Sequence, residues 1–164
     1  MILCFACSTN QNVPKVVPSV DLQRYAGKWY EIASFPVSFE KGCSCISAEY
    51  TLTDKDYVKV YNSCRKGGPN GKISSITGKA FVVPGSNNAK LKVQFFWPFR
   101  APYWIIGLAD DYSWAIISGP SRKYLWILSR SRTMDPMLYS QLIDKLKADG
   151  FDTGKIVKAN QECD

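Results

Sequence analysis

The feature that most constrains the fold is a succession of eight short segments in which apolar and polar residues alternate. Alternation with a period of two is typical of strands that bury one face. Turn sequences rich in Gly, Pro, Asn and Asp separate the segments at roughly hairpin spacing, which predicts antiparallel neighbours. The pattern therefore predicts an all-β domain, either a sandwich or an eight-stranded antiparallel up-and-down barrel. The expected strands are residues 29–33, 46–52, 57–62, 76–82, 90–95, 103–109, 113–118 and 124–130.

Beyond these segments the apolar period becomes helical. The run begins with Asp135 and Pro136, which suit an N-cap and a first helical turn, and it ends at Gly150. We expect an amphipathic α-helix over residues 136–149 that packs on the outside of the sheet, followed by a short strand at residues 155–158. Its apolar stripe is formed by leucines that recur every four residues, at Leu138, Leu142 and Leu146.

The first strand opens with Gly27-Lys28-Trp29-Tyr30-Glu31. The glycine permits a tight turn, and the tryptophan that follows is a large side chain for burial. Strict alternation predicts that Trp29, Glu31 and Ala33 share one face, whereas Tyr30 and Ile32 share the other.

The charge of the chain does not indicate a nucleic-acid partner. The 164 residues suit one domain, and the net charge of +7 comes from Lys and Arg residues that are scattered rather than clustered. An oligonucleotide-binding barrel would have five strands instead of eight. We therefore expect no nucleic acid, and no apolar run approaches the ~20 residues of a membrane-spanning helix.

The six cysteines favour disulfides over a metal site. Cys43 and Cys45 form a Cys-x-Cys pair, which does not match zinc spacing, and the chain contains no histidine. We therefore expect no metal and no cofactor. Disulfides would place the protein in an oxidising compartment.

The N-terminus is similar to the end of a bacterial lipoprotein signal. Apolar residues lead through Ala6 to Cys7, which is the candidate for lipidation, although Phe5 stands where a small residue is usual. A lipid on Cys7 would anchor the protein to a membrane without a spanning helix. We interpret residues 1–19 as a signal remnant and tether, and residues 20–164 as the folded domain.

Three motifs in order make the chain resemble the lipocalin family, most closely the bacterial outer-membrane lipocalins, which are apolipoprotein D-like. The first is the Gly27–Glu31 segment, the second is Asp110-Asp111-Tyr112 without the usual Thr, and the third is Arg130 at the end of the last strand. The resemblance extends from about Val20 to Cys163. It implies the closed barrel with one C-terminal helix outside it.

The resemblance also implies structural roles for several residues. Arg130 would lie across Trp29 at the closed end of the barrel, where a cation–π contact contributes about 1 kcal/mol or more, and Gly27 would belong to the same structural motif. It implies disulfides joining Cys45 to Cys163 and Cys43 to Cys64. From the residues alone, Cys43 and Cys45 could exchange roles.

Lipocalins bind small hydrophobic molecules inside the barrel, and the bacterial members are associated with fatty acids and lysophospholipids at the cell envelope. The resemblance implies the same function here, in a protein anchored to the bacterial outer membrane and facing the periplasm, or alternatively secreted. The inward face is apolar, and its small residues Gly78 and Ala80 would leave room for a ligand. The charge favours an anionic head group at the mouth, with Arg100 among the candidate partners. The proposed ligand-binding residues are Tyr50, Val60, Asn62, Ala80, Val93, Phe95, Trp126 and Leu128.

An enzyme that acts on a lipid or isoprenoid and a loop-mediated partner-binding module are the competing functions. We do not expect an enzyme, because histidine is missing and the cysteines are expected to be paired or lipidated. Glu31, the one acid expected on the inward face, would be the candidate base. A homodimer that closes the barrel mouth is left open.

Overall fold

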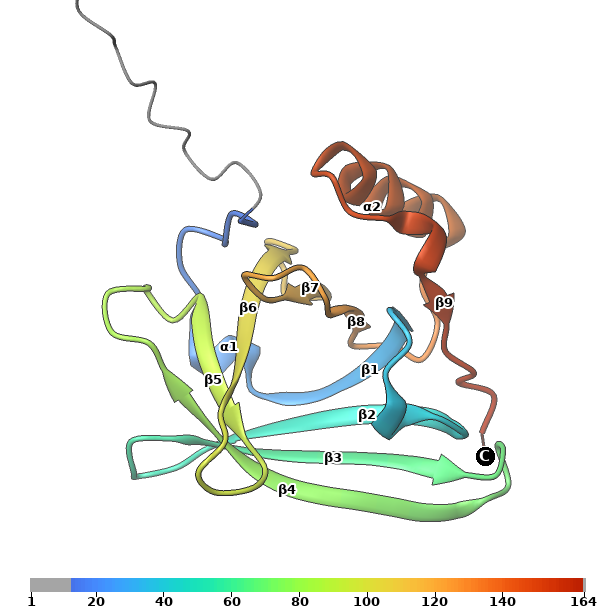
Figure 1. The fold of residues 1–164 in the computed structure, drawn as a ribbon, viewed down its shortest axis with the longest axis horizontal. Coiled ribbons are helices and arrows are strands. Elements are labelled where there is room, and N and C mark those ends of the chain that lie inside the picture. Colours follow the sequence, from blue (N-terminus) through green and yellow to red (C-terminus); the bar gives the residue numbers. More distant parts are fainter. Residues whose placement is uncertain (1–12, 164) are drawn as a thin grey trace, which may run out of the picture.

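The computed structural model describes residues 13–163, in which nine strands form one antiparallel sheet that closes into an eight-stranded barrel. The predicted barrel and the outer helix are confirmed, and the sandwich alternative is wrong (Figure 1). The elements in chain order are α1 (Leu22–Tyr25), β1 (Gly27–Ser34), η1 (Ser38–Glu40), β2 (Cys43–Leu52), β3 (Val58–Lys66), β4 (Lys72–Val82), β5 (Lys90–Gln94), β6 (Ala101–Leu108), β7 (Trp114–Ser118), β8 (Leu125–Ser129), α2 (Pro136–Ala148), η2 (Thr153–Lys155) and β9 (Val157–Lys158).

Strand β1 closes the barrel. Its first half, from Gly27 to Tyr30, pairs with β2, and its second half, from Tyr30 to Ser34, pairs with β8. All other barrel strands pair with their neighbours in sequence. The expected last strand exists as β9, which is short and pairs with the end of β1.

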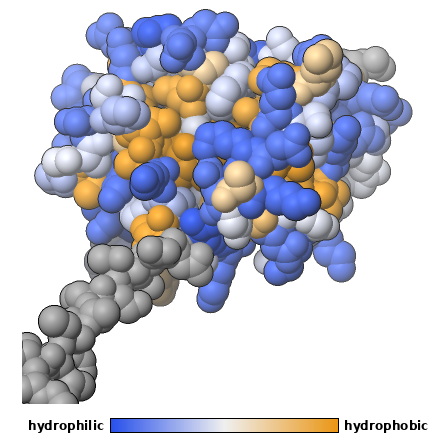
Figure 2. Space-filling view, turned by 90° about the horizontal axis from the view of Figure 1, so that it is seen from above, coloured by the Kyte–Doolittle hydropathy of each residue, from blue (hydrophilic) through white to orange (hydrophobic). Residues whose placement is uncertain are grey.

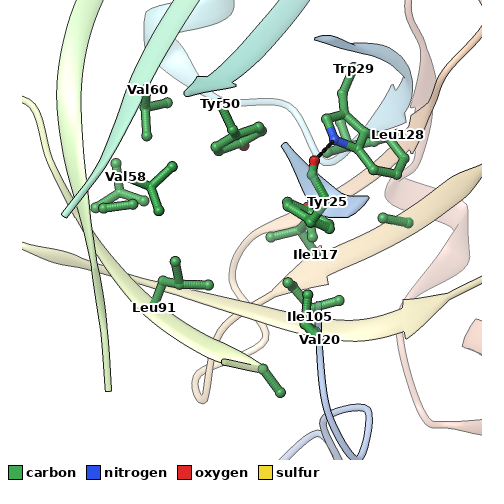
Figure 3. Packing of buried hydrophobic residues seen from close by; sticks show 14 residues of the cluster. Val20, Tyr25, Trp29, Tyr50, Val58, Val60, Leu91, Ile105, Ile117 and Leu128 are labelled. Atoms are coloured by element: carbon green, nitrogen blue, oxygen red, sulfur yellow. Dashed lines mark hydrogen bonds between the residues drawn. The ribbon is translucent and has the colours of Figure 1, made fainter. Parts of the chain in front are cut away.

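The barrel interior is packed at the end where β1 begins. Trp29 has no exposed surface, and its indole Nε1 donates to the carbonyl oxygen of Tyr25 at 2.8 Å. Figure 3 shows Trp29 and Tyr25 beside Ile117 and Leu128 from strands β7 and β8. Aromatic and branched side chains that converge on one point bury much apolar surface, so this end of the barrel is closed by packing.

The predicted faces of β1 hold for its first half only. Trp29 and Glu31 point inward as expected, but Ile32 and Ala33 both belong to the outer apolar cluster beneath α2. A β-bulge between Glu31 and Ala33 causes this difference, because one extra residue on β1 reverses the alternation that follows it. The prediction that Ala33 shares a face with Trp29 was therefore wrong.

The C-terminal helix lies against the outside of the barrel (Figure 1). Helix α2 begins where predicted, because the Asp135 side chain accepts hydrogen bonds from two backbone amides of the first turn at 2.9 and 3.0 Å. Two of the three leucines of the predicted stripe, Leu142 and Leu146, are buried against Ile116 and Ile127 of the barrel wall. Viewed from the side of α2, the surface is mainly hydrophilic, with apolar patches between the polar side chains (Figure 2).

Two disulfides tie the barrel together, with the pairing that the resemblance implies. Cys43 is bonded to Cys64 across the β2–β3 ladder, and Cys45 is bonded to Cys163 in the C-terminal segment. The Cys45 amide also donates to the carbonyl oxygen of Asn160 at 2.7 Å. The proposed lipidation site Cys7 lies outside the described residues. Within residues 13–163, no helix is both long and apolar enough to cross a membrane.

Candidate ligand-binding cavity

The closed end of the barrel is held by one guanidinium group. Arg130 lies 3.8 Å from the ring centroid of Trp29 and donates to the carbonyl oxygens of Arg24, Tyr25 and Lys28 at 2.6, 3.1 and 3.0 Å. The predicted stacking of Arg130 on Trp29 is therefore present in the structure. These hydrogen bonds hold the Arg130 side chain across the buried Trp29. Because the Arg130 side chain covers this end of the barrel, the end leaves no entrance for a ligand.

The backbone conformation at position 27, next to the Arg130 guanidinium, favours a glycine. Its φ of +96° is in the region that favours glycine, and a Cβ atom would come within 3.3 Å of Arg130 Nη1. The second motif lies at the same end, where the Tyr112 hydroxyl accepts a hydrogen bond from the Asp21 amide at 2.9 Å. Arg24 lies 4.0 Å above the ring of Tyr112. The three motifs therefore meet at the closed end, far from the opposite mouth.

The other half of the barrel contains a cavity of about 240 Å³. This half of the barrel lies at the end of β1. The short helix η1, between β1 and β2, contributes Phe39 and Glu40 to the lining of the cavity. The wall is mainly apolar, and aromatic residues surround the opening. The remaining lining residues are Glu31, Ile46, Ser47, Ala48, Tyr50, Val60, Asn62, Val93, Phe95, Ala101, Pro102, Tyr103, Ile117, Tyr124, Trp126 and Leu128.

Seven of the eight proposed ligand-binding residues line this cavity, because alternation along each strand places them on its inner surface. They are Tyr50, Val60, Asn62, Val93, Phe95, Trp126 and Leu128.

Ala80 does not line the cavity. It belongs to the packed core cluster and is 1% exposed, next to Val93 in the register of β4 and β5. The expected room at Gly78 is filled as well, because a Cβ atom there would lie 2.6 Å from the Phe95 ring. Phe95 therefore occupies the space that the small residues of β4 leave, and it sets one wall of the cavity.

Tyr50 and Tyr103 form the floor of the cavity, and Tyr25 lies behind them in the packed core. The Tyr103 hydroxyl is hydrogen-bonded to the hydroxyls of Tyr25 at 2.6 Å and Tyr50 at 2.8 Å. Burial raises the pKa of Tyr50 to about 12, so its hydroxyl stays neutral. Sequence reasoning missed Tyr103, although it falls on the expected strand 103–109 and pairs with inward-facing Leu91.

Two acids meet inside the cavity, where only Glu31 was expected. Glu31 is 4% exposed, and Glu40 from η1 lines the cavity beside it, close enough for its charge to act on the Glu31 carboxyl. Burial, followed by the nearby charge of Glu40, raises the pKa of Glu31 to about 8. Trp126 Nε1 donates to Glu40 Oε1 at 3.1 Å. Glu40 lies in a loop, and no sequence pattern pointed to it.

The basic residues are not where the sequence led us to expect them. Among the described residues that line the cavity, none is Lys or Arg. Arg100 lies outside it, with its guanidinium 3.8 Å from the ring centroid of Phe81. Arg100 therefore does not line the cavity, because its side chain lies over Phe81, and its contact with a ligand head group stays a prediction.

Comparisons with known proteins agree with this architecture. A profile of lipocalin-like domains matches residues 20–161. The outer membrane lipoprotein Blc of Vibrio cholerae is 36% identical over 162 residues, which cover 98% of this chain and 94% of the relative. Temperature-induced lipocalin-1 of Arabidopsis thaliana is 40% identical over 162 residues, covering 93% and 86%.

A solved structure has the same fold. Insecticyanin from the tobacco hornworm Manduca sexta aligns with a TM-score of 0.70 and 26% identity, over 90% of this chain and 85% of that one. The profile covers the whole barrel, and both sequence relatives exceed 30% identity over nearly the full chain. The chain therefore belongs to the lipocalin family.

Proposed function

We propose that the protein binds a single-chain lipid, a fatty acid or a lysophospholipid, in the barrel cavity, and carries or stores it at the cell envelope. Lipocalins bind small hydrophobic ligands, and this chain belongs to that family. The observation that carries the proposal is the apolar cavity of about 240 Å³ between the tyrosine floor and the mouth. Its volume is just below the ~300–1,000 Å³ of sites for drug-sized ligands, so it suits one slender chain.

The residues proposed to contact the ligand are the seven that line the cavity. Val60, Val93 and Leu128 would contact the hydrocarbon chain near the floor. Trp126 and Phe95 would contact it nearer to the mouth, where loops follow β5 and precede β8.

The open end supports exchange of a lipid with a membrane. The loop between β5 and β6 exposes Phe96, Trp97 and Phe99, and Trp97 is 86% exposed. Exposed apolar side chains beside a cavity mouth mark a surface for apolar contacts. We propose that the protein is held at the outer membrane, facing the periplasm, by a lipid on Cys7 and a tether within residues 1–19, which ends where Val16 and Val17 pack against the core. Secretion without an anchor is the alternative.

A binding role fits the chemistry of the cavity better than catalysis. The described cysteines, 43, 45, 64 and 163, are all in disulfides, and the chain contains no histidine. Glu31, the candidate base, has a pKa of about 8 and therefore holds its proton at neutral pH. Only the small ionised fraction of such a carboxyl can accept a proton at neutral pH.

Tryptophan fluorescence tests the proposal. We expect palmitate and a palmitoyl lysophospholipid to quench the emission saturably, and Trp126→Phe to lose most of this signal. Trp104→Phe is the control, because Trp104 lies outside the cavity beneath the Lys90 ammonium, 4.2 Å from its ring. The absence of a saturable change with either lipid would overturn the proposed function. An equal loss of quenching in Trp126→Phe and Trp104→Phe would show that the lipid binds outside the cavity.

A further inference from the structure

We propose that the cavity recognises an alkyl ammonium, an amphiphile whose polar end is a primary ammonium group, through Glu31, Glu40, Asn62 and Trp126. The inference rests on the proposed function, because it assumes that the cavity holds one hydrocarbon chain. It adds the chemistry of the polar end. It ranks an ammonium above the carboxylate of a fatty acid as the preferred polar end, against the expectation of an anionic head group that came from the net charge of the whole chain.

The first argument is the pair of acids in the cavity wall. Neither Glu31 nor Glu40 has an ion-pair partner within 4 Å among the described residues. Buried carboxyls without a cation are unfavourable, and they remain in a protein when they are protonated or paired with a cation. A ligand ammonium would supply the missing cation.

The second argument is an amide oxygen without a partner. Asn62 Oδ1 is buried and accepts no hydrogen bond from any described residue, although Asn62 lines the same cavity. Buried polar atoms nearly always have a partner, so an exception at a cavity indicates a missing donor. An ammonium has three N–H donors, whereas a carboxylate has none and would leave Asn62 Oδ1 without a partner.

The third argument is the aromatic wall beside the acids. The Tyr124 ring is stacked on Trp126, with centroids 5.7 Å apart, and Phe39 and Phe95 line the same opening. Aromatic faces attract cations, and the attraction grows when water is excluded. Unpaired carboxyls and several aromatic rings together favour a cation and disfavour a second anion.

The lysines near Glu31 and Glu40 do not supply the cation that these two acids lack inside the cavity. Lys66 Nζ donates to the carbonyl oxygens of Phe39 and Lys41, at 3.3 and 3.0 Å, and its charge favours the ionised form of Glu40. Lys41 and Lys158 line an adjoining outer groove that shares Glu31, Glu40 and Ile46 with the cavity, but neither lysine forms an ion pair with these acids. Among the described residues that line the barrel cavity itself, none is basic.

Binding of an ammonium would move one proton. Glu31 and Glu40 line the same part of the cavity, and burial together with the nearby charge of Glu40 keeps the proton on Glu31 when no cation is bound. A cation beside the pair stabilises the second negative charge, so Glu31 releases its proton to the buffer as the ligand binds. Affinity for the amine then falls by up to tenfold per pH unit as the pH drops below the pKa of Glu31.

The test compares three probes of one chain length, dodecylamine, dodecanol and laurate, by calorimetric titration at pH 7.5 below their micelle concentrations. We expect dodecylamine to bind at least tenfold more tightly than laurate. In the variant with both Glu31→Gln and Glu40→Gln, this preference should disappear. Glu49→Gln is the matched control, because Glu49 is exposed on the outer side of β2, and it should keep the preference.

A second measurement needs no variant. Titration of the wild type with dodecylamine in two buffers of different ionisation enthalpy should show release of up to one proton per bound molecule. Laurate binding as tightly as dodecylamine, or no proton release, would overturn the inference while the chain-binding cavity stands. Failure of all three probes to bind would overturn the proposed function together with the inference.

Discussion

Replacing Arg130 by Met is expected to destabilise the barrel by about 3 kcal/mol, because one guanidinium holds the closed end together. Methionine keeps much of the aliphatic stem, so the change removes mainly the charged head. That head lies 3.8 Å from the Trp29 ring centroid and donates to the carbonyl oxygens of Arg24, Tyr25 and Lys28.

The magnitude follows from the exposure of each contact. The cation–π contact lies against a fully buried indole, so its loss costs roughly 1–2 kcal/mol. The hydrogen bonds to the carbonyl oxygens of Tyr25 at 3.1 Å and Tyr112 at 3.3 Å are half-buried and charge-assisted, and together they add roughly 1.5 kcal/mol. The bonds to Arg24 and Lys28 are exposed and contribute little, because water replaces the guanidinium there.

Urea unfolding at 25 °C, followed by circular dichroism with the disulfides intact, measures this loss as a change in the free energy of unfolding. Arg132→Met is the control, since Arg132 is exposed and lies 5.2 Å from the Tyr30 ring centroid, and it should cost less than about 0.5 kcal/mol. Arg130→Lys keeps the charge but not the planar fork, so its loss should be intermediate. An Arg130→Met loss below about 1 kcal/mol would refute the reasoning.

Three further predictions concern the pH response, one disulfide and the N-cap of α2. The folded pKa of Glu31, about 8, exceeds the ordinary 4.5, so the folded state retains a proton and loses stability as the pH rises through that window. Glu31→Gln should therefore match the wild type in urea unfolding at pH 4.5 and exceed it by a few kcal/mol (order of magnitude) at pH 9; parallel pH profiles would contradict this. Replacing Cys45 and Cys163 together by Ser opens a loop of 118 residues and should cost roughly 4–5 kcal/mol in the chain-entropy treatment, measured as a lower urea midpoint, with an unchanged midpoint as the contrary result. Asp135→Ala removes the α2 cap and should cost about 1 kcal/mol, whereas Asp144→Ala, away from that cap, should change the thermal midpoint little.

The strands and the helix could be predicted because their signals are local. A period of two places alternate side chains on the inner surface of a barrel wherever the strand is regular. Seven lining residues, among them Tyr50 and Trp126, therefore followed from alternation alone. The helix start followed from Asp135 and Pro136, because a cap acts within one turn.

The family motifs were also readable, because each is a short run of residues. Their meeting point, where Arg130 covers Trp29, came from the resemblance and was then observed. By contrast, the β-bulge after Glu31 has no clear local signal, and it sends Ala33 to the outer cluster. One added residue is invisible in a short alternating run, yet it reverses every face that follows.

The cavity itself depends on contacts between segments that are distant in sequence. The space beside Gly78 is closed by Phe95 from the next strand, so small residues on one strand do not predict room. Glu40 reaches Glu31 from a loop, and only the folded chain brings the two carboxyls together. Alternation along one strand sets which side chains face inward, but the volume and charge between strands depend on how all the inward side chains pack against one another.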